Sequence, residues 1–254
     1  MKTIKILSMI LLVSLMGIQS VCAQGASSKP TIIFVHGVWA DGSCWGYQIA
    51  ELQARGYNVI SVQNPLTSLA DDVAATKRAI DLTPGDIILV GHSWGGFVIT
   101  QAGNNPKVKG LVFVAAFAPD AGESVPSLSA NGPATELGKY FVPEDTFLGL
   151  SREGVKKVFA QDLNAKQQEL IYATQIAASQ TLFDEKSGDP AWKQKPNWCI
   201  VAKHDNAISP ELERFMAKRI NAKTIEVESC HVVMLAHPKE VLSIIEEAAN
   251  SLTK

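Results

Sequence analysis

Short runs of aliphatic and β-branched residues alternate with amphipathic stretches along most of the chain. A run such as residues 32–35 has no polar residue between its apolar ones, which is typical of strands that are buried on both faces of a parallel sheet. The stretches between them have helical periodicity and the length that connects one parallel strand to the next. The predicted strands are residues 31–36, 57–62, 86–91, 108–116, 197–202 and 223–228.

Capping signals mark where the predicted helices begin and end. Ser68 precedes a helix over residues 69–81, whose first turn carries Asp71, and Gly56 ends a helix that starts near Trp45. We therefore expect a single α/β domain over residues 24–254, with a mostly parallel sheet flanked by helices. The other predicted helices are residues 97–104, 210–220 and 238–251.

The alternation of strands and helices stops between Phe117 and Pro196. This stretch begins with a loop rich in proline, glycine and serine, and it has no continuous apolar run of the buried-strand kind. Helical patterns follow near residues 151–161 and 165–180. We interpret about residues 119–195 as a helical lid that is inserted into the domain.

The first 23 residues have the organisation of a secretory signal peptide. Lys2 and Lys5 precede an apolar stretch that ends near Ile18, and the small residue Ala23 closes a cleavage pattern. The alternative is a membrane anchor that stays attached, but the apolar stretch is short for a span of the bilayer. We therefore expect cleavage after about Ala23, export to the periplasm or the extracellular space, and no stable membrane span in the mature chain.

Composition narrows the function classes further. Hydrophobic residues make up 46% and charged residues 19% of the chain, as in an ordinary globular protein, and the formal net charge of -2 gives no sign of nucleic-acid binding. Signal cleavage would leave Cys44, Cys199 and Cys230. An odd number of cysteines does not make a disulfide framework, so buried thiols are expected, with a Cys199–Cys230 pair left open. No Cys/His spacing indicates a metal, and no metal or organic cofactor is expected.

Residues 91–95, Gly-His-Ser-Trp-Gly, match the pattern G-x-S-x-G between a predicted buried strand and a predicted helix. The pattern alone is weak, but this setting is the one that a nucleophile elbow requires. There a serine on a strained turn carries its hydroxyl above the edge of the sheet, and glycines let the strand and the helix approach each other. We predict that Ser93 is the nucleophile; the alternative is an inert serine in a glycine-rich turn.

A serine nucleophile needs a histidine base, and the histidine needs an acid that orients it. His231 follows the last predicted strand, and Asp205 follows the strand before it. Both side chains would lie beyond the carboxyl ends of strands, where ligands gather in open α/β sheets. The predicted triad is therefore Ser93, Asp205 and His231, with Asp120, after the fourth predicted strand, as the competing acid.

Two backbone N–H groups should stabilise the oxyanion of a tetrahedral intermediate. One belongs to Trp94, the residue after the nucleophile, and the other to the loop after the first predicted strand. In that loop Val38 is the expected donor, and Gly37 lets the backbone come close. His36 and His92 precede the acid in the chain and are expected to be structural.

Five segments together resemble the α/β-hydrolase superfamily: residues 32–45, 64–75, 89–99, 205–217 and 230–241. The resemblance is to the small serine esterase branch that holds plant methyl esterases, hydroxynitrile lyases and bacterial esterase-like members. It covers most of the chain outside the signal peptide and the lid. It implies an α/β-hydrolase fold, a triad and two oxyanion donors at the positions already named: Ser93, Asp205, His231, Val38 and Trp94.

Two positions separate this chain from the hydroxynitrile lyases of that branch, which carry a lysine after the catalytic histidine and a threonine beside the oxyanion loop. Here these positions are Val232 and Gly37. A lysine would supply the positive charge that holds a leaving cyanide, so its absence favours hydrolysis. The expected activity is that of a carboxylesterase on small or medium apolar esters. The candidate substrate contacts are Phe117, Phe141, Phe147, Leu148, Tyr172 and Trp192.

Other functions stay open at this point. The same triad can carry out lactone hydrolysis, perhydrolysis or carbon–carbon bond cleavage, and the fold also serves non-enzymatic ligand binding. The complete set of triad residues argues against pure binding, and a partner-binding role would need an exposed apolar patch on the lid. The expected partner is a small-molecule ester, and the oligomeric state is left open, with a homodimer as one option.

Overall fold

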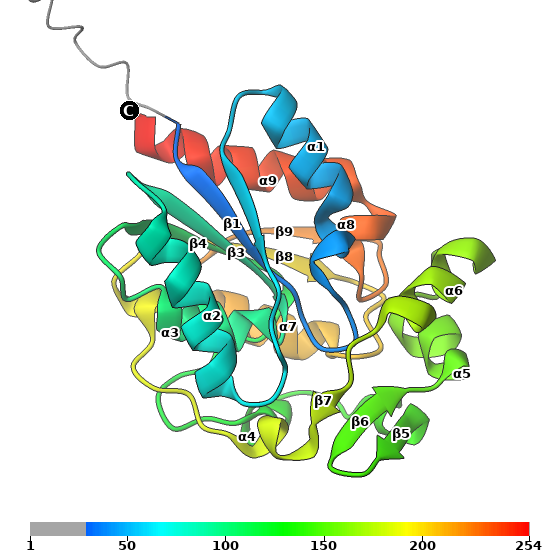
Figure 1. Ribbon diagram of the computed structural model, residues 1–254. Coiled ribbons are helices and arrows are strands. Elements are labelled where there is room, and N and C mark those ends of the chain that lie inside the picture. Colours follow the sequence, from blue (N-terminus) through cyan, green and yellow to red (C-terminus); the bar gives the residue numbers. More distant parts are fainter. Residues whose placement is uncertain (1–28, 254) are drawn as a thin grey trace, which may run out of the picture.

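A six-stranded sheet forms the centre of the computed structural model, which describes residues 29–253 (Figure 1). Its strands are β1 (Thr31–Val35), β2 (Val59–Val62), β3 (Ile87–Ser93), β4 (Val108–Ala116), β8 (Asn197–Ala202) and β9 (Lys223–Val227). They follow the order β2-β1-β3-β4-β8-β9, and all neighbouring pairs are parallel. The inner strands are almost fully buried, as expected for continuous apolar runs, whereas the edge strands β2 and β9 are partly exposed.

All six predicted strands occur in this sheet, and the expected fold class is confirmed. The largest differences from the predicted bounds are two residues: β2 begins at Val59, and β3 continues to Ser93. The register between β3 and β4 shifts after His92, so that Ser93 pairs with Ala116. The strand therefore extends into the turn that carries the predicted nucleophile.

Helices pack on both faces of the sheet: α1 (Gly46–Ala54), α2 (Leu69–Leu82), α3 (Gly95–Ala102), α7 (Pro210–Arg219) and α9 (Pro238–Asn250). In Figure 1, α1 and α9 lie on one side of the sheet, and α2, α3 and α7 lie on the other. The side chain of Ser68 accepts the N–H of Asp71 and caps α2 as predicted. A short helix, α8 (Val233–Ala236), precedes α9 and follows the loop after β9.

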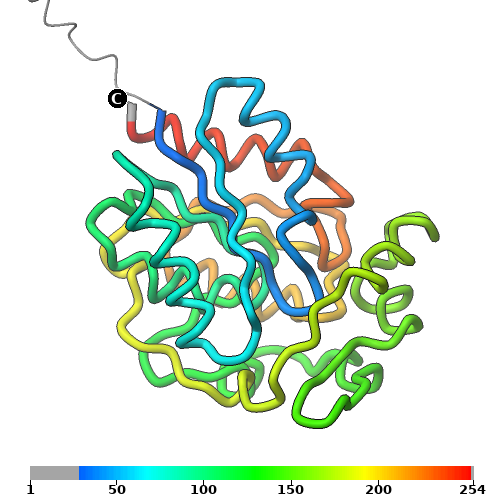
Figure 2. Tube along the Cα trace, viewed as in Figure 1, coloured from blue at the N-terminus to red at the C-terminus, as the bar shows by residue number. Residues whose placement is uncertain are grey.

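Residues 117–196 lie between β4 and β8 and combine helices with a small sheet. The helices are α4 (Val125–Ser129), α5 (Arg152–Gly154) and α6 (Ala165–Thr174). The strands β5 (Phe141–Glu144), β6 (Phe147–Leu150) and β7 (Ala178–Ser179) form an antiparallel sheet in that order. Figures 1 and 2 show this green-to-yellow segment along one end of the central sheet. We call residues 117–196 the inserted segment.

The strands of the inserted segment were not predicted, and the helix predicted near residues 165–180 is shorter, since α6 spans Ala165–Thr174. The side chain of Gln175 binds the backbone N–H of Leu150 at 2.8 Å and its carbonyl at 3.0 Å. The N–H of Ser179 donates to the carbonyl of Leu66 at 2.9 Å. These contacts with distant segments hold residues 175–179 in an extended path, so α6 ends at Thr174.

Tighter and wider helical turns complete the described chain. Short 3-10 helices span Gly42–Trp45, Leu137–Tyr140, Gln180–Asp184, Ala191–Lys193 and Ser251–Thr253, and a π-helical turn spans Val155–Phe159. The predicted signal peptide, residues 1–23, lies outside the described residues. Between residues 29 and 253, no helix has the length and apolar character needed to cross a membrane. In the same part of the chain, Cys44, Cys199 and Cys230 are free and buried.

Candidate active site

Ser93 stands on the turn from β3 into α3 in a backbone conformation that residues with a side chain rarely adopt. Its φ is +52°, in the left-handed region. Such a conformation costs about 1–3 kcal/mol and persists only where the surrounding structure holds it. Ser93 is 8% exposed and borders a cavity. The turn thus has the strain that a nucleophile elbow requires.

The glycines around this turn stand where other backbone passes close by. A Cβ on Gly95 would overlap the carbonyl oxygen of Val35 in β1. One on Gly96 would overlap the backbone of Phe117, directly after β4. One on Gly91 would lie 2.7 Å from the carbonyl oxygen of Gly95. The three glycines therefore let the first turn of α3 pack directly against the sheet, as the motif predicted.

Asp205 and His231 are in direct contact. Asp205 follows β8 and His231 follows β9, at the strand ends where the sequence predicted them. Nδ1 of His231 lies 2.5 Å from Oδ2 of Asp205, and both side chains are at most 1% exposed. Because an ionised carboxylate only accepts hydrogen bonds, Nδ1 carries the proton, and Nε2 of the neutral imidazole is an acceptor.

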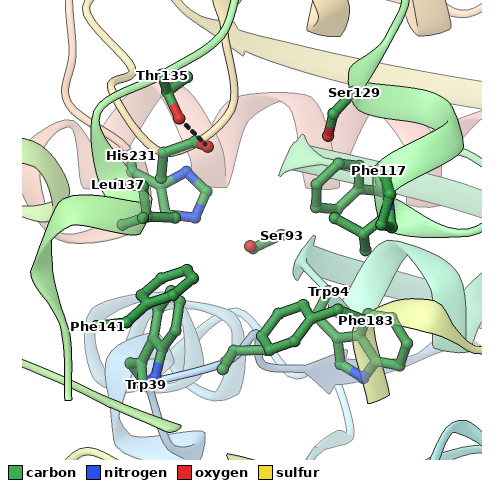
Figure 3. Close-up of a pocket in the computed structure, with 15 residues that line it drawn as sticks. Trp39, Ser93, Trp94, Phe117, Ser129, Thr135, Leu137, Phe141, Phe183 and His231 are labelled. Atoms are coloured by element: carbon green, nitrogen blue, oxygen red, sulfur yellow. Dashed lines mark hydrogen bonds between the residues drawn. The ribbon is translucent and has the colours of Figure 1, made fainter. Parts of the chain in front are cut away.

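The carboxylate of Asp205 is also anchored by its own loop. Its Oδ1 accepts the N–H of Ala207 at 2.6 Å and the N–H of Ile208 at 2.9 Å. Together with the imidazole, these donors stabilise the ionised carboxylate away from water. Figure 3 shows the His231 imidazole and the Ser93 hydroxyl on the wall of one cavity. This arrangement suits transfer of the hydroxyl proton to the imidazole.

Two other histidines and the competing acid are placed differently. His92 is buried, and its Nε2 donates to the carbonyl of His231 at 3.1 Å, which holds the loop of the predicted base. Burial lowers the pKa of His92 well below its usual value, so the ring stays neutral. Asp120 pairs with the Lys193 ammonium at 2.6 Å, near the surface. His204 is exposed, and its Nε2 lies 3.0 Å from Oε2 of Glu228.

The loop after β1 holds the predicted oxyanion donor Val38 at the edge of the cavity. Nε2 of the buried His36 accepts the N–H of Asn64 at 2.9 Å, so Nδ1 carries the proton and donates to the Gly37 carbonyl at 2.8 Å. Burial lowers the pKa of His36, which keeps this neutral tautomer. The Gly37 carbonyl and the Val38 N–H belong to one planar peptide, so this hydrogen bond also orients the N–H.

Trp94, the second predicted oxyanion donor, is held by a side chain from α2. Its indole Nε1 donates to Oδ2 of Asp72 at 2.8 Å, and Oδ1 of Asp72 accepts the N–H of Leu66 at 2.9 Å. Asp72 is fully buried, and this burial raises the pKa of its carboxyl to about 6 although both hydrogen bonds oppose the rise. Asp72 supports the elbow, and nothing in the sequence indicated this role.

A cavity of about 370 Å³ opens beside Ser93 (Figure 3). Part of its wall is aromatic: the ring centroid of Trp39 lies 5.2 Å from that of Phe141 and 6.2 Å from that of Phe183. Aspartate, glutamate, lysine and arginine are absent from its lining, which belongs entirely to the described part of the chain. Within residues 29–253, no group of three or more histidine, cysteine or acidic side chains is arranged to hold a metal ion.

Phe117 and Phe141 are the two predicted substrate contacts that line this cavity. Phe147 and Leu148 do not line it, because they lie in β6, where they pair with β7. The backbone carbonyl of Leu148 accepts the indole N–H of Trp39 at 2.9 Å, so it is Trp39 that stands at the cavity. Phe147 and Leu148 were predicted as substrate contacts, and the structure places both outside the lining of this cavity.

Tyr172 and Trp192 also lie away from the cavity. The guanidinium of Arg152 stacks 4.2 Å from the centroid of the Tyr172 ring, beside a separate surface depression. Trp192 is buried, and its Nε1 donates to the carbonyl of Pro119 at 2.8 Å. An apolar ring that packs inside the protein and one that faces a cavity have the same sequence signal, and the structure places Tyr172 and Trp192 outside the lining of this cavity.

Nine residues of the cavity lining were not predicted, and Trp39, Leu137 and Phe183 are among them. Trp39 directly follows Val38, so its place in the oxyanion loop was a usable signal. Leu137 and Phe183 lie in short 3-10 helices of the inserted segment. No periodic pattern marks such turns, and only their contacts in three dimensions place them at the cavity.

A family model described as the alpha/beta hydrolase family matches residues 32–244. The chain therefore belongs to the alpha/beta hydrolase family. The methylesterases among its relatives agree with the branch that the sequence resembles.

Two relatives show how far the similarity reaches. The carbendazim hydrolyzing esterase of Nocardioides sp. (strain SG-4G) is 31% identical over 126 residues, which cover 43% of this chain and 51% of that esterase. Methylesterase 2 of Arabidopsis thaliana is 25% identical over 248 residues, which cover 83% of this chain and 92% of the relative. The first match thus spans about half of the relative, and the second spans nearly all of it.

Solved structures share the fold at lower identity. An extracellular alpha/beta-hydrolase from a Paenibacillus species superimposes with a TM-score of 0.73 at 23% identity, covering 87% of this chain and 99% of that one. Polyneuridine aldehyde esterase superimposes with a TM-score of 0.74 at 18% identity, covering 86% of this chain and 98% of that one. The likeness extends over the inserted segment as well as the sheet, because nearly the whole of each structure is matched.

Proposed function

We propose that this protein is a serine carboxylesterase with Ser93, His231 and Asp205 as its triad. The proposal rests on the buried hydrogen bond between His231 and Asp205, which lies beside the same cavity as a serine in a strained turn. A histidine whose Nδ1 is held by a carboxylate presents Nε2 as a base. The esterases among the relatives support the same reaction class.

The proposed reaction forms and then hydrolyses an acyl-enzyme. Ser93 Oγ attacks the ester carbonyl while Nε2 of His231 takes its proton, and Asp205 stabilises the imidazolium. The backbone N–H groups of Val38 and Trp94 donate to the oxyanion of the tetrahedral intermediate. His231 then protonates the leaving alcohol, and a water molecule repeats the sequence on the acyl-enzyme.

The substrate we propose is a neutral ester of small or medium size with an aromatic or other apolar group. The volume of the cavity falls within the range of about 300–1,000 Å³ that small-molecule sites occupy. Its lining has aromatic rings but no charged aspartate, glutamate, lysine or arginine side chain. A charged substrate would lose its hydration there without gaining an opposite charge.

Covalent labelling tests the nucleophile directly. Intact-mass measurement after treatment with a fluorophosphonate should give one adduct on the wild type and none on Ser93→Ala. Ser129→Ala is the matched control, because Ser129 also places its side chain at the cavity (Figure 3). Equal labelling of Ser93→Ala and wild type would refute the assignment, and a folded wild type without any adduct would favour a ligand-binding protein.

We also propose that the protein is exported, from the signal-peptide pattern of residues 1–23. Expression of the full chain in a bacterial host, followed by separation of periplasm, medium and cytoplasm, tests this. Intact mass should correspond to a chain that begins near residue 24. Full-length protein that stays in the cytoplasm would contradict the proposal.

A further inference from the structure

Close to the proposed triad lies a buried carboxyl group that has no part in the proposed reaction. Glu213, near the start of α7, is 1% exposed. Its Oε2 accepts the N–H of Ala202, the last residue of β8, at 3.0 Å. Its Oε1 has no hydrogen-bond donor among the residues that the structure describes. A buried carboxyl oxygen without a donor is expected of a protonated acid that itself donates.

The acceptor we assign to that proton is the Asp205 carboxylate: the backbone N–H of Asp205 donates to the carbonyl of Ala202 at 3.1 Å, so Glu213 and Asp205 are both held at Ala202, and the charge of Asp205 and a hydrogen bond to it raise the pKa of Glu213. Two carboxyl groups in contact and away from water cannot both be ionised, so they share one proton. Asp205 accepts from two backbone N–H groups and from His231, whereas Glu213 accepts from one backbone N–H. The negative charge is therefore better stabilised on Asp205, and the proton stays on Glu213.

The other titratable and charged groups around Glu213 do not reverse this assignment. Burial raises the pKa of Glu213 well above its usual range, and the charge and the hydrogen bond of Asp205 raise it further. Arg214 lowers the pKa of Glu213 by less, since its guanidinium lies at the surface, paired with Glu226. Cys199 in β8 also interacts with Glu213, and burial raises the pKa of its thiol, which therefore stays uncharged. The dipole of α7 favours an ionised Glu213, but a second buried carboxylate in contact outweighs it.

We propose that Glu213 is a positioning residue: in its neutral form it donates an O–H hydrogen bond to the Asp205 carboxylate and holds that carboxylate against His231. The expected effect of Glu213 on turnover rests on the proposed ester hydrolysis, whereas the assignment of its protonation state does not depend on that proposal. The contact joins α7 to the loop after β8, so the carboxylate keeps its orientation while the imidazolium forms and disappears. Glu213 keeps its proton throughout, and no proton is transferred between the two carboxyl groups.

Two substitutions distinguish a neutral Glu213 from an ionised one. Glu213→Gln is uncharged and of equal size; its amide carbonyl can accept from Ala202, and its amide N–H can donate to Asp205. We expect its kcat to stay within about threefold of wild type and the acid limb of its kcat/KM pH profile to be unchanged. Glu213→Leu removes both hydrogen bonds, and we expect kcat to fall between about 10- and 100-fold with little change in KM.

An ionised Glu213 would give the opposite pattern. Its negative charge would raise the basicity of His231, so Glu213→Gln would move the acid limb of kcat/KM to lower pH. A folded Glu213→Gln variant, checked by circular dichroism, that shows this movement and loses as much kcat as Glu213→Leu would overturn the proposal.

Infrared spectroscopy tests the protonation state without a substrate. The difference spectrum between wild type and Glu213→Gln near neutral pH should contain the carbonyl stretch of a protonated carboxylic acid. A spectrum that contains only carboxylate bands would overturn the proposal, even if Glu213→Leu does not fold. If the wild type hydrolyses no ester at all, the proposed function fails, and the infrared band still decides the state of Glu213.

Discussion

The central sheet and the inserted segment both border the cavity, but they supply different groups. The groups assigned to bond breaking stand at strand ends of the sheet: Ser93 is the last residue of β3, Val38 follows β1, Asp205 follows β8 and His231 follows β9. The inserted segment supplies apolar wall residues such as Phe141 and Phe183 and no member of the proposed triad. Changes in the sheet should therefore affect the rate of reaction, and changes in the inserted segment should affect the choice of substrate.

The largest expected effect is on the proposed base. His231→Ala should lower kcat for a neutral aryl ester by at least about 10³-fold, because the nucleophile loses the group that takes its proton. Steady-state kinetics measures this, and His204→Ala, which changes an exposed histidine next to the acid, is the matched control. Near-normal turnover by a folded His231→Ala protein would show that His231 is not the base of the reaction.

The next effect is on the packing of the elbow. Gly96→Ala should lower the free energy of unfolding by about 2–3 kcal/mol, because the new Cβ would overlap the backbone of Phe117. Gly46→Ala is the control: no atom lies near its Cβ position, and its conformation is helical. Chemical denaturation compares the two variants, and equal stabilities would show that α3 can move away from the sheet.

A pH effect of up to about 3 kcal/mol is expected from Asp72, which holds the indole of Trp94. The folded protein binds the Asp72 proton more tightly than the unfolded chain does, since the folded pKa is about 6. The stability of wild type relative to Asp72→Asn should therefore fall as the pH rises from about 4 to about 7. Denaturation curves across this range measure it, and a difference that is constant or grows with pH would contradict the burial of Asp72.

The smallest effect is expected in the inserted segment and concerns the substrate. Phe141→Ala should lower kcat/KM for an aryl ester by about 10-fold, because an apolar contact with the bound group is lost. Phe147→Ala, which changes a ring of the same small sheet outside the cavity lining, should leave it near the wild-type value. Fluorophosphonate labelling of both variants should remain complete. If Phe147→Ala has the larger effect, the cavity is not the substrate site.

The central sheet could be predicted closely because its signals are local. A run such as residues 108–116 is apolar from Gly110 onward since both of its faces are covered there, and β4 has the bounds predicted for it. The positions of Ser93, Asp205 and His231 follow from strand ends, and so does their approach to one edge of the sheet. Trp192 shows where prediction from local signals ends, because a large apolar ring in the inserted segment could equally pack inside the protein or face a substrate.

By itself the sequence determined the order of strands and helices, the glycines that the elbow needs and the residue types that the proposed chemistry uses. These features depend on periodicity and on the space around single residues, which neighbours in the chain encode. Only the tertiary structure decided that Asp205 rather than Asp120 contacts His231, that Trp39 and Phe183 line the cavity, and that the buried Glu213 accepts the N–H of Ala202. These features are contacts between elements, and they depend on how separate elements pack, for which no local pattern carries a signal.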